Sequence, residues 1–135
     1  MAVVLIVDDD ALVAETIGMY LESAGHEAVL ARHGGEALER LKKYPIDVAL
    51  TDILMPEVEG FEFLLSARRQ GHEVPIIAMT GGSKRHASAG GEYDYLKMAR
   101  QLGATRSIKK PFTQRQLLDE VEACLNEQMN KEENI

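Results

Sequence analysis

The sequence predicts an α/β fold, a doubly wound (βα)5 domain whose five-stranded parallel sheet is covered by helices on both faces. Two features lead to this prediction. Short apolar runs alternate with segments in which apolar residues recur at helical spacing, and most of these runs are followed closely by acidic, hydroxyl or basic side chains. Such alternation favours parallel strands joined by right-handed crossovers. A length of 135 residues suits one domain with a substantial core.

Three strands are expected in the first half of the chain. Residues 2–7 form a continuous apolar run that ends abruptly at three consecutive aspartates. Residues 27–31 alternate more weakly and suit the edge of the sheet. Residues 46–50 are short, apolar and uninterrupted, which is typical of a strand buried on both faces, and they lead directly toward Asp52.

Two further strands are expected in the second half. Residues 74–79 form another buried run, which ends at Thr80. Residues 105–108 form a short strand, and Lys110 with its following proline comes soon after it. Between these strands, residues 83–91 are small, polar and rich in glycine, which predicts a flexible loop.

Helices are expected to connect the strands and to follow the last one. Their apolar residues lie at helical spacing, and glycines mark several of their ends. Beyond the last apolar position, the polar segment from Asn126 is expected to fray. The first helix is expected to carry apolar positions from Leu12 and to end before Gly25, and the second opens at Gly34. The third includes Phe61 and ends at Gly71, and the fourth covers 92–102. The last runs from the capping residue Thr113 to Leu125.

The composition narrows the classes of function. A net charge of −7 argues against partners such as nucleic acid or an anionic membrane, because both attract an excess of positive charge. The single cysteine, Cys124, excludes an internal disulfide framework and a cysteine metal cluster. No apolar run approaches the ~18 residues of a membrane span and no signal-like segment opens the chain, so we expect a cytoplasmic protein without membrane insertion.

Reactive side chains follow four of the predicted strands. Asp8 and Asp9 follow the first strand, Asp52 the third, Thr80 the fourth and Lys110 the fifth. The carboxyl ends of parallel strands meet at one edge of a sheet, so we expect these side chains to gather there. Three carboxylates held close together repel one another, and a hard divalent cation such as Mg²⁺ relieves that repulsion.

The same residues indicate phosphoryl chemistry. A lysine supplies a positive point charge and a threonine supplies a hydroxyl donor, and together they suit the anionic oxygens of a phosphoryl group. Asp52 is then the expected nucleophile, because the cation, Lys110 and Thr80 would surround the oxygen with which it attacks. Asp10 is better explained as a helix cap than as part of the site.

Four motifs stand at the ends of predicted strands: Val-Leu-Ile-Val-Asp-Asp-Asp (4–10), Leu-Thr-Asp-Ile-Leu-Met-Pro-Glu-Val-Glu-Gly (50–60), Met-Thr-Gly (79–81) and Lys-Lys-Pro-Phe (109–112). In this order they resemble the CheY-like receiver domain of two-component response regulators. The resemblance covers roughly residues 3–126, which implies a receiver domain at 1–128 and a polar C-terminal tail at 129–135. It also implies the flavodoxin-like strand order 2-1-3-4-5.

The resemblance implies a role for each matching residue. Asp52 corresponds to the phosphoacceptor of the family. Asp9 corresponds to a direct Mg²⁺ ligand and Asp8 to an acid that acts through water, while Asp52 and the backbone carbonyl of Leu54 complete the protein ligands. Gly60, at the end of the same motif, has a structural interpretation, namely shaping the loop beside Asp52.

The remaining matches imply how the domain would work. Thr80 corresponds to the hydroxyl that moves toward the phosphoryl group, and Lys110 to the lysine of the family, whereas Lys109 is interpreted as a surface charge. The implied function is that of a stand-alone response regulator. It would accept a phosphoryl group from a sensor histidine kinase or a histidine phosphotransfer protein. It would then bind a downstream protein target or pass the group on in a phosphorelay, and it would not be an enzyme beyond catalysing its own phosphorylation and dephosphorylation.

Two departures from the family pattern matter. The family usually has an aromatic residue three positions before the lysine, and this chain has Ser107 there. The segment between Thr80 and Lys110 is also several residues longer than usual and is rich in glycine around 81–91. We therefore expect the usual threonine-to-aromatic switch to be altered and the loop to carry part of the output surface.

Two other functions stay open on the sequence. One is a receiver-like binding module in which phosphorylation does not drive output, which Ser107 suggests. The other is a small phosphotransferase or phosphatase with an aspartyl-phosphate intermediate. Against that enzyme stands the absence of a second acid in the four residues after Asp52, which are Ile, Leu, Met and Pro.

Overall fold

The computed structural model describes residues 1–53, 59–81 and 97–133. Within these residues, five parallel strands form one sheet in the order β2-β1-β3-β4-β5. This confirms the predicted doubly wound α/β fold and its flavodoxin-like strand order. The strands are β1 (Val3–Val7), β2 (Glu27–Ala31), β3 (Val48–Asp52), β4 (Ile76–Gly81) and β5 (Arg106–Lys110).

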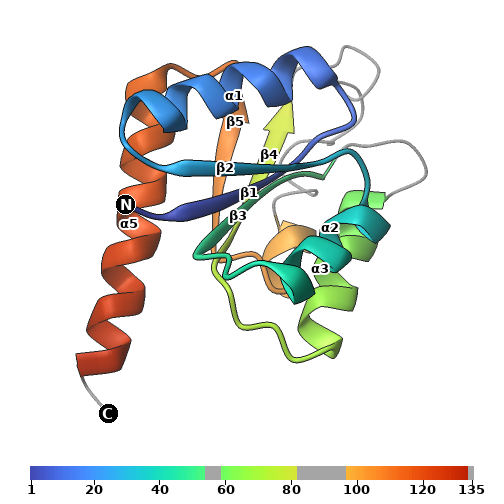
Figure 1. Ribbon diagram of the computed structural model, residues 1–135. Coiled ribbons are helices and arrows are strands. Elements are labelled where there is room, and N and C mark those ends of the chain that lie inside the picture. The colour runs from blue at the N-terminus through green and yellow to red at the C-terminus, as the bar shows by residue number, and fades with distance from the viewer. Residues whose placement is uncertain (54–58, 82–96, 134–135) are drawn as a thin grey trace.

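Helices cover both faces of the sheet (Figure 1). One core cluster packs α1 and α5 against the sheet, and a second packs α2 and α3 against the opposite face. Residues 97–101 are also helical and lie within the helix predicted at 92–102, whose first part lies outside the described residues. The labelled helices are α1 (Ala11–Ser23), α2 (Gly34–Lys43), α3 (Glu59–Arg69) and α5 (Gln114–Glu133).

Helix ends follow the capping chemistry of the sequence. The side chain of Asp10 accepts hydrogen bonds from the backbone N–H groups of Leu12 and Val13, which confirms its role as the cap of α1. Thr113 and Gln116 bond each other's backbone N–H groups in a reciprocal capping box at the start of α5. Gly25 ends α1 with φ +88°, a backbone conformation that residues other than glycine rarely adopt.

The centre of the sheet is apolar on both faces. All residues of β3 are buried, as are nearly all of β1 and β4, which explains their uninterrupted apolar runs. β2 is partly exposed, as expected for an edge strand. Among the described helices, none combines the length and apolarity that crossing a membrane requires.

Some element boundaries differ from the predicted ones. β3 begins at Val48 and includes Asp52, because its last residues pair with β4. α5 continues to Glu133 instead of fraying from Asn126, since its last turns are rich in Glu, Gln and Met, which favour helix. Leu12 is exposed, because the core-facing stripe of α1 is set by Ala14, Ile17 and Leu21.

Arg68, near the end of α3, ties three backbone segments together. Its Nε and Nη2 donate to the carbonyl of Gly103, at 3.1 and 2.8 Å. Its Nη1 donates to the carbonyls of His72 and Val74, both at 2.8 Å. A Cβ on Gly103 would lie 2.7 Å from Arg68 Cγ, so the arginine side chain fills the space that a side chain there would need. The guanidinium thus joins the end of α3 to the chain before β4 and to the turn before β5.

Arg68→Lys is expected to lower the free energy of unfolding by about 1–3 kcal/mol. A lysine keeps the charge, but its single nitrogen cannot bond both sets of carbonyls. Urea denaturation monitored by circular dichroism measures the change. Arg69→Lys, at the exposed neighbouring position, is the matched control and should leave stability near that of the natural chain. Equal stability of the two variants would contradict the bridging role of Arg68.

Candidate functional site

The predicted reactive residues lie at one edge of the sheet. The parallel register pairs Val7 with Thr51, and Asp52 with Met79. It also pairs Gly81 with Lys110. The strand ends therefore lie side by side, and the side chains that end them face a common region.

Three carboxylates converge at this edge, as the sequence predicted. One oxygen from each of Asp8, Asp9 and Asp52 lies within 4.8 Å of the others. Asp8 is completely buried and Asp52 nearly so, whereas Asp9 is exposed. Two acids are thus withdrawn from water while the third faces it, and a cation entering from solvent would meet all three.

Lys110 lies between the two buried acids. Its Nζ is 2.8 Å from Asp8 Oδ2 and 3.0 Å from Asp52 Oδ2. Burial by itself lowers the pKa of Lys110, but the attraction of Asp52 and Asp8 outweighs it, so the pKa lies above its usual 10.5. The contribution of this ion pair to stability is therefore present below pH 10.5 and is lost as the pH rises through the folded-state pKa.

Asp8 is costly to keep ionised in this position. Burial raises its pKa above 3.8, and the hydrogen bonds from Lys110 and from the backbone N–H of Asp10 offset this only in part. Protonated Asp8 therefore favours the folded state, and this contribution is lost as the pH rises through its folded-state pKa. A buried carboxylate that one lysine does not fully compensate suits a second positive charge, and the all-oxygen cluster fits Mg²⁺.

Thr80 brings a hydrogen-bond donor to the same edge. The residue is 1% exposed, and its Oγ1 has no hydrogen-bond partner within the part of the chain that the structure describes. Buried hydroxyl groups are usually paired, so an unpaired one marks a place where a ligand oxygen would fit. Thr80 thus lies at the end of β4, beside the end of β5 that carries Lys110.

Several predictions fall elsewhere. The carbonyl of Leu54 and the loop at 83–91 lie outside the described residues. Ser107 is half-buried in β5 and pairs with Ala78, and Lys109 is exposed, as its interpretation as a surface charge implied.

The pairing of Lys110 with Asp8 was not anticipated from the sequence, although strand alternation contains the information. Lys110 lies two residues after Ile108 in β5, and Asp8 lies two residues after Ile6 of β1. Both isoleucines belong to the core cluster beneath α1 and α5. The lysine and the acid therefore start on the same face of the sheet.

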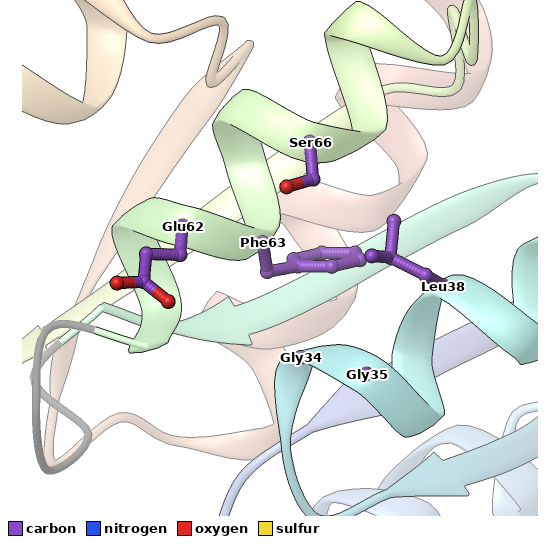
Figure 2. A pocket seen from close by; sticks show the side chains of 6 residues that line it. All are labelled: Gly34, Gly35, Leu38, Glu62, Phe63 and Ser66. Carbon is purple, nitrogen blue, oxygen red and sulfur yellow. The ribbon is translucent and has the colours of Figure 1, made fainter.

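A separate small hollow of about 110 Å³ lies between α2 and α3. Figure 2 shows it with Phe63 and Leu38 among its lining residues. Among the described residues that line the hollow, Glu62 is the only titratable one, and none of the predicted site residues lines it. The hollow is therefore distinct from the acidic site.

Comparison with known proteins agrees with this geometry. A family model described as the response regulator receiver domain matches residues 4–122. Response regulator SaeR of Staphylococcus aureus is 32% identical over 114 residues, which make up 84% of this chain and 46% of that protein. The chain thus spans about half the length of the curated relatives it matches.

Solved structures resemble the whole fold. A CheY-like receiver domain protein from Methanospirillum hungatei is 29% identical with a TM-score of 0.84, over 97% of this chain and 98% of that one. The chemotaxis response regulator CheY4 of Vibrio cholerae is 31% identical with a TM-score of 0.78, over 93% and 99%. NtrX from Brucella abortus, solved in complex with ATP, is 25% identical with a TM-score of 0.85, over 98% of this chain and 28% of that one.

Lys110→Met is expected to lower the free energy of unfolding of the metal-free protein by about 3 kcal/mol at neutral pH. The change leaves the buried carboxylates of Asp8 and Asp52 without their cation. The loss should shrink as the pH falls, because burial raises the pKa of Asp8 and lets it become protonated at a higher pH than an exposed aspartate. Urea denaturation in the presence of a chelator measures both values.

Lys109→Met is the matched control, since it removes one positive charge from the exposed neighbouring position. It should change stability by about 0.5 kcal/mol or less. A loss in Lys110→Met that did not depend on pH would contradict the ion-pair explanation.

Proposed function

Because this chain belongs to the response regulator receiver domain family, we propose that it accepts a phosphoryl group on Asp52 from a sensor histidine kinase or a histidine phosphotransfer protein. The observation that best supports this is the convergence of Asp52 with Lys110 Nζ at 3.0 Å, among carboxylates that suit a divalent cation. Receiver domains are phosphoacceptors rather than conventional enzymes. Self-catalysed phosphorylation and dephosphorylation of this chain are part of the proposal.

The transfer itself exchanges one bond to phosphorus for another. A carboxylate oxygen of Asp52 forms the new O–P bond while the N–P bond of the phosphohistidine breaks, and its electron pair returns to the imidazole nitrogen. Lys110 would turn from the Asp52 carboxylate toward the phosphoryl oxygens, and its positive charge would offset theirs. The hydroxyl of Thr80, which has no partner among the described residues, would donate a hydrogen bond to one of these oxygens.

Mg²⁺ is the proposed cofactor. Asp8, Asp9 and Asp52 would hold it, together with the backbone carbonyl of Leu54 predicted from the family pattern. When bound, the ion supplies positive charge against the phosphoryl oxygens. The chain's own contribution is to hold two buried carboxylates and one exposed carboxylate within reach of a single ion.

The proposed output is protein binding that depends on phosphorylation, or onward transfer of the group in a phosphorelay. Family membership supports this class of output. The cytoplasmic location stays a prediction.

A second candidate is a receiver-like module whose partner binding does not depend on phosphorylation. Ser107 favours it, because this half-buried position of β5 lacks the aromatic side chain usual in the family. Hydrogen exchange of the backbone amides of β5, measured before and after phosphorylation, distinguishes the two functions. Exchange that is the same before and after phosphorylation would favour the second, and exchange that changes would favour the first.

Incubation with acetyl phosphate and Mg²⁺ is expected to add one phosphoryl group to the natural chain. Asp52→Asn should gain none, because an amide is not a nucleophile of this kind. Intact-mass spectrometry measures the addition, and omission of Mg²⁺ should slow it strongly. Asp47→Asn, at an exposed aspartate of the opposite sheet edge, is the control and should be labelled like the natural chain. Labelling of Asp52→Asn to the same extent would place the acceptor elsewhere.

Asp9→Asn is expected to weaken Mg²⁺ binding by at least about tenfold, since it removes one charged ligand from the cluster. Isothermal titration calorimetry measures the dissociation constant. Asp10→Asn is the matched control: asparagine keeps the helix cap of α1, and Asp10 is not in the cluster. Equal Mg²⁺ affinity of the two variants would count against Asp9 as a ligand.

A further inference from the structure

Gly60 makes an unusually close approach to the phosphoacceptor. It is the second residue of α3 and is buried against the end of β3. A Cβ added to it would overlap the carbonyl oxygen of Asp52 and would lie 2.5 Å from the Cα of Ile53. Both obstacles are backbone atoms, so no side-chain rotation would relieve the overlap.

Space, and not backbone conformation, explains a glycine at this position. The glycines with positive φ among the described residues are Gly25, Gly71, Gly81 and Gly103, and Gly60 is not one of them. Its backbone is helical, where glycine is less favourable than alanine. The chain thus carries the poorer helix former at the place where α3 meets Asp52.

The backbone that Gly60 contacts is also held from its other side. Asp52 pairs with Met79 of β4, and the N–H of Ile53 donates to the carbonyl of Met79 at 3.2 Å. The side chain of Ile53 is buried, as are Phe61 and Phe63 of α3. Neither the strand end nor the helix can therefore retreat without losing pairing or packing.

We propose that Gly60 is a positioning residue for Asp52. Its missing side chain lets the first turn of α3 lie directly on the end of β3, which fixes where the Asp52 carboxylate stands relative to Lys110. This inference rests on the proposed function of Asp52. A methyl group at Gly60 would displace the strand end, and a small displacement of a reacting group slows its reaction steeply.

The test compares Gly60→Ala with Gly35→Ala. Gly35 is likewise the second residue of a helix, α2, and a Cβ there would lie 3.5 Å from His33 Nδ1, an ordinary contact. Both changes bring the same gain in helix propensity, so they differ in the overlap with Asp52. The rate constant for phosphorylation by acetyl phosphate at saturating Mg²⁺ and the Mg²⁺ dissociation constant are measured for each, per folded molecule.

Gly60→Ala is expected to lower the phosphorylation rate constant by at least about tenfold, while Gly35→Ala matches the natural chain. The Mg²⁺ dissociation constant should change by a much smaller factor than the rate constant, because two of the three clustered carboxylates, Asp8 and Asp9, lie on the loop after β1 and only Asp52 would be displaced. This separation distinguishes positioning of Asp52 from a general loss of structure.

Each other outcome overturns the inference. Equal rates in Gly60→Ala and in the natural chain would refute it while leaving the proposed function intact. A natural chain that is not phosphorylated would overturn the proposed function and this inference with it. If Gly60→Ala is unfolded, the rate is measured with trimethylamine N-oxide, which favours compact states. Failure to fold even then would mean that Gly60 serves the whole fold instead of Asp52.

Discussion

The site depends on keeping like charges buried at one edge of a parallel sheet. Asp8 and Asp52 are both withdrawn from water, and each carboxylate would be costly to bury alone. Lys110 compensates for both, with its Nζ at 2.8 Å from one and 3.0 Å from the other. Asp52 pairs with Met79 and Met79 pairs with Ile108, so Lys110 lies two residues further along the sheet than Asp52. The electrostatics of the site therefore depend on the register of the sheet.

Lys110 does not fully compensate for the two buried carboxylates, and the polar groups that are left indicate what else the site could bind. The pKa of Asp8 stays raised despite the lysine, and the hydroxyl of Thr80 has no partner among the described residues. One group thus favours a further positive charge, and the other favours a further acceptor oxygen. A cation together with a phosphoryl group would satisfy both, which is why a phosphoacceptor function agrees with the polar groups better than a purely structural ion pair does.

Much of this could be predicted from the sequence because it depends on local patterns. Apolar runs identified the strands, and residues that end them identified Asp8, Asp52, Thr80 and Lys110 as one group. The limits of β3 and α5 were less predictable, since pairing with β4 extended the one and helix propensity extended the other. The contact of Gly60 with the carbonyl of Asp52 could not be predicted, because only the packing of α3 on the sheet brings those backbones together.

The four hydrogen bonds of Arg68 have a mechanical consequence for α3. Two of them hold the last turn of the helix to Gly103, in the turn that leads into β5, and two hold it to the chain before β4. The first turn of the same helix rests on the end of β3. A helix of 11 residues is a stiff rod about 16 Å long. α3 therefore links the edge of the sheet that carries Asp52 to the opposite edge, so a tilt of the helix beside Asp52 would also move the turn before β5.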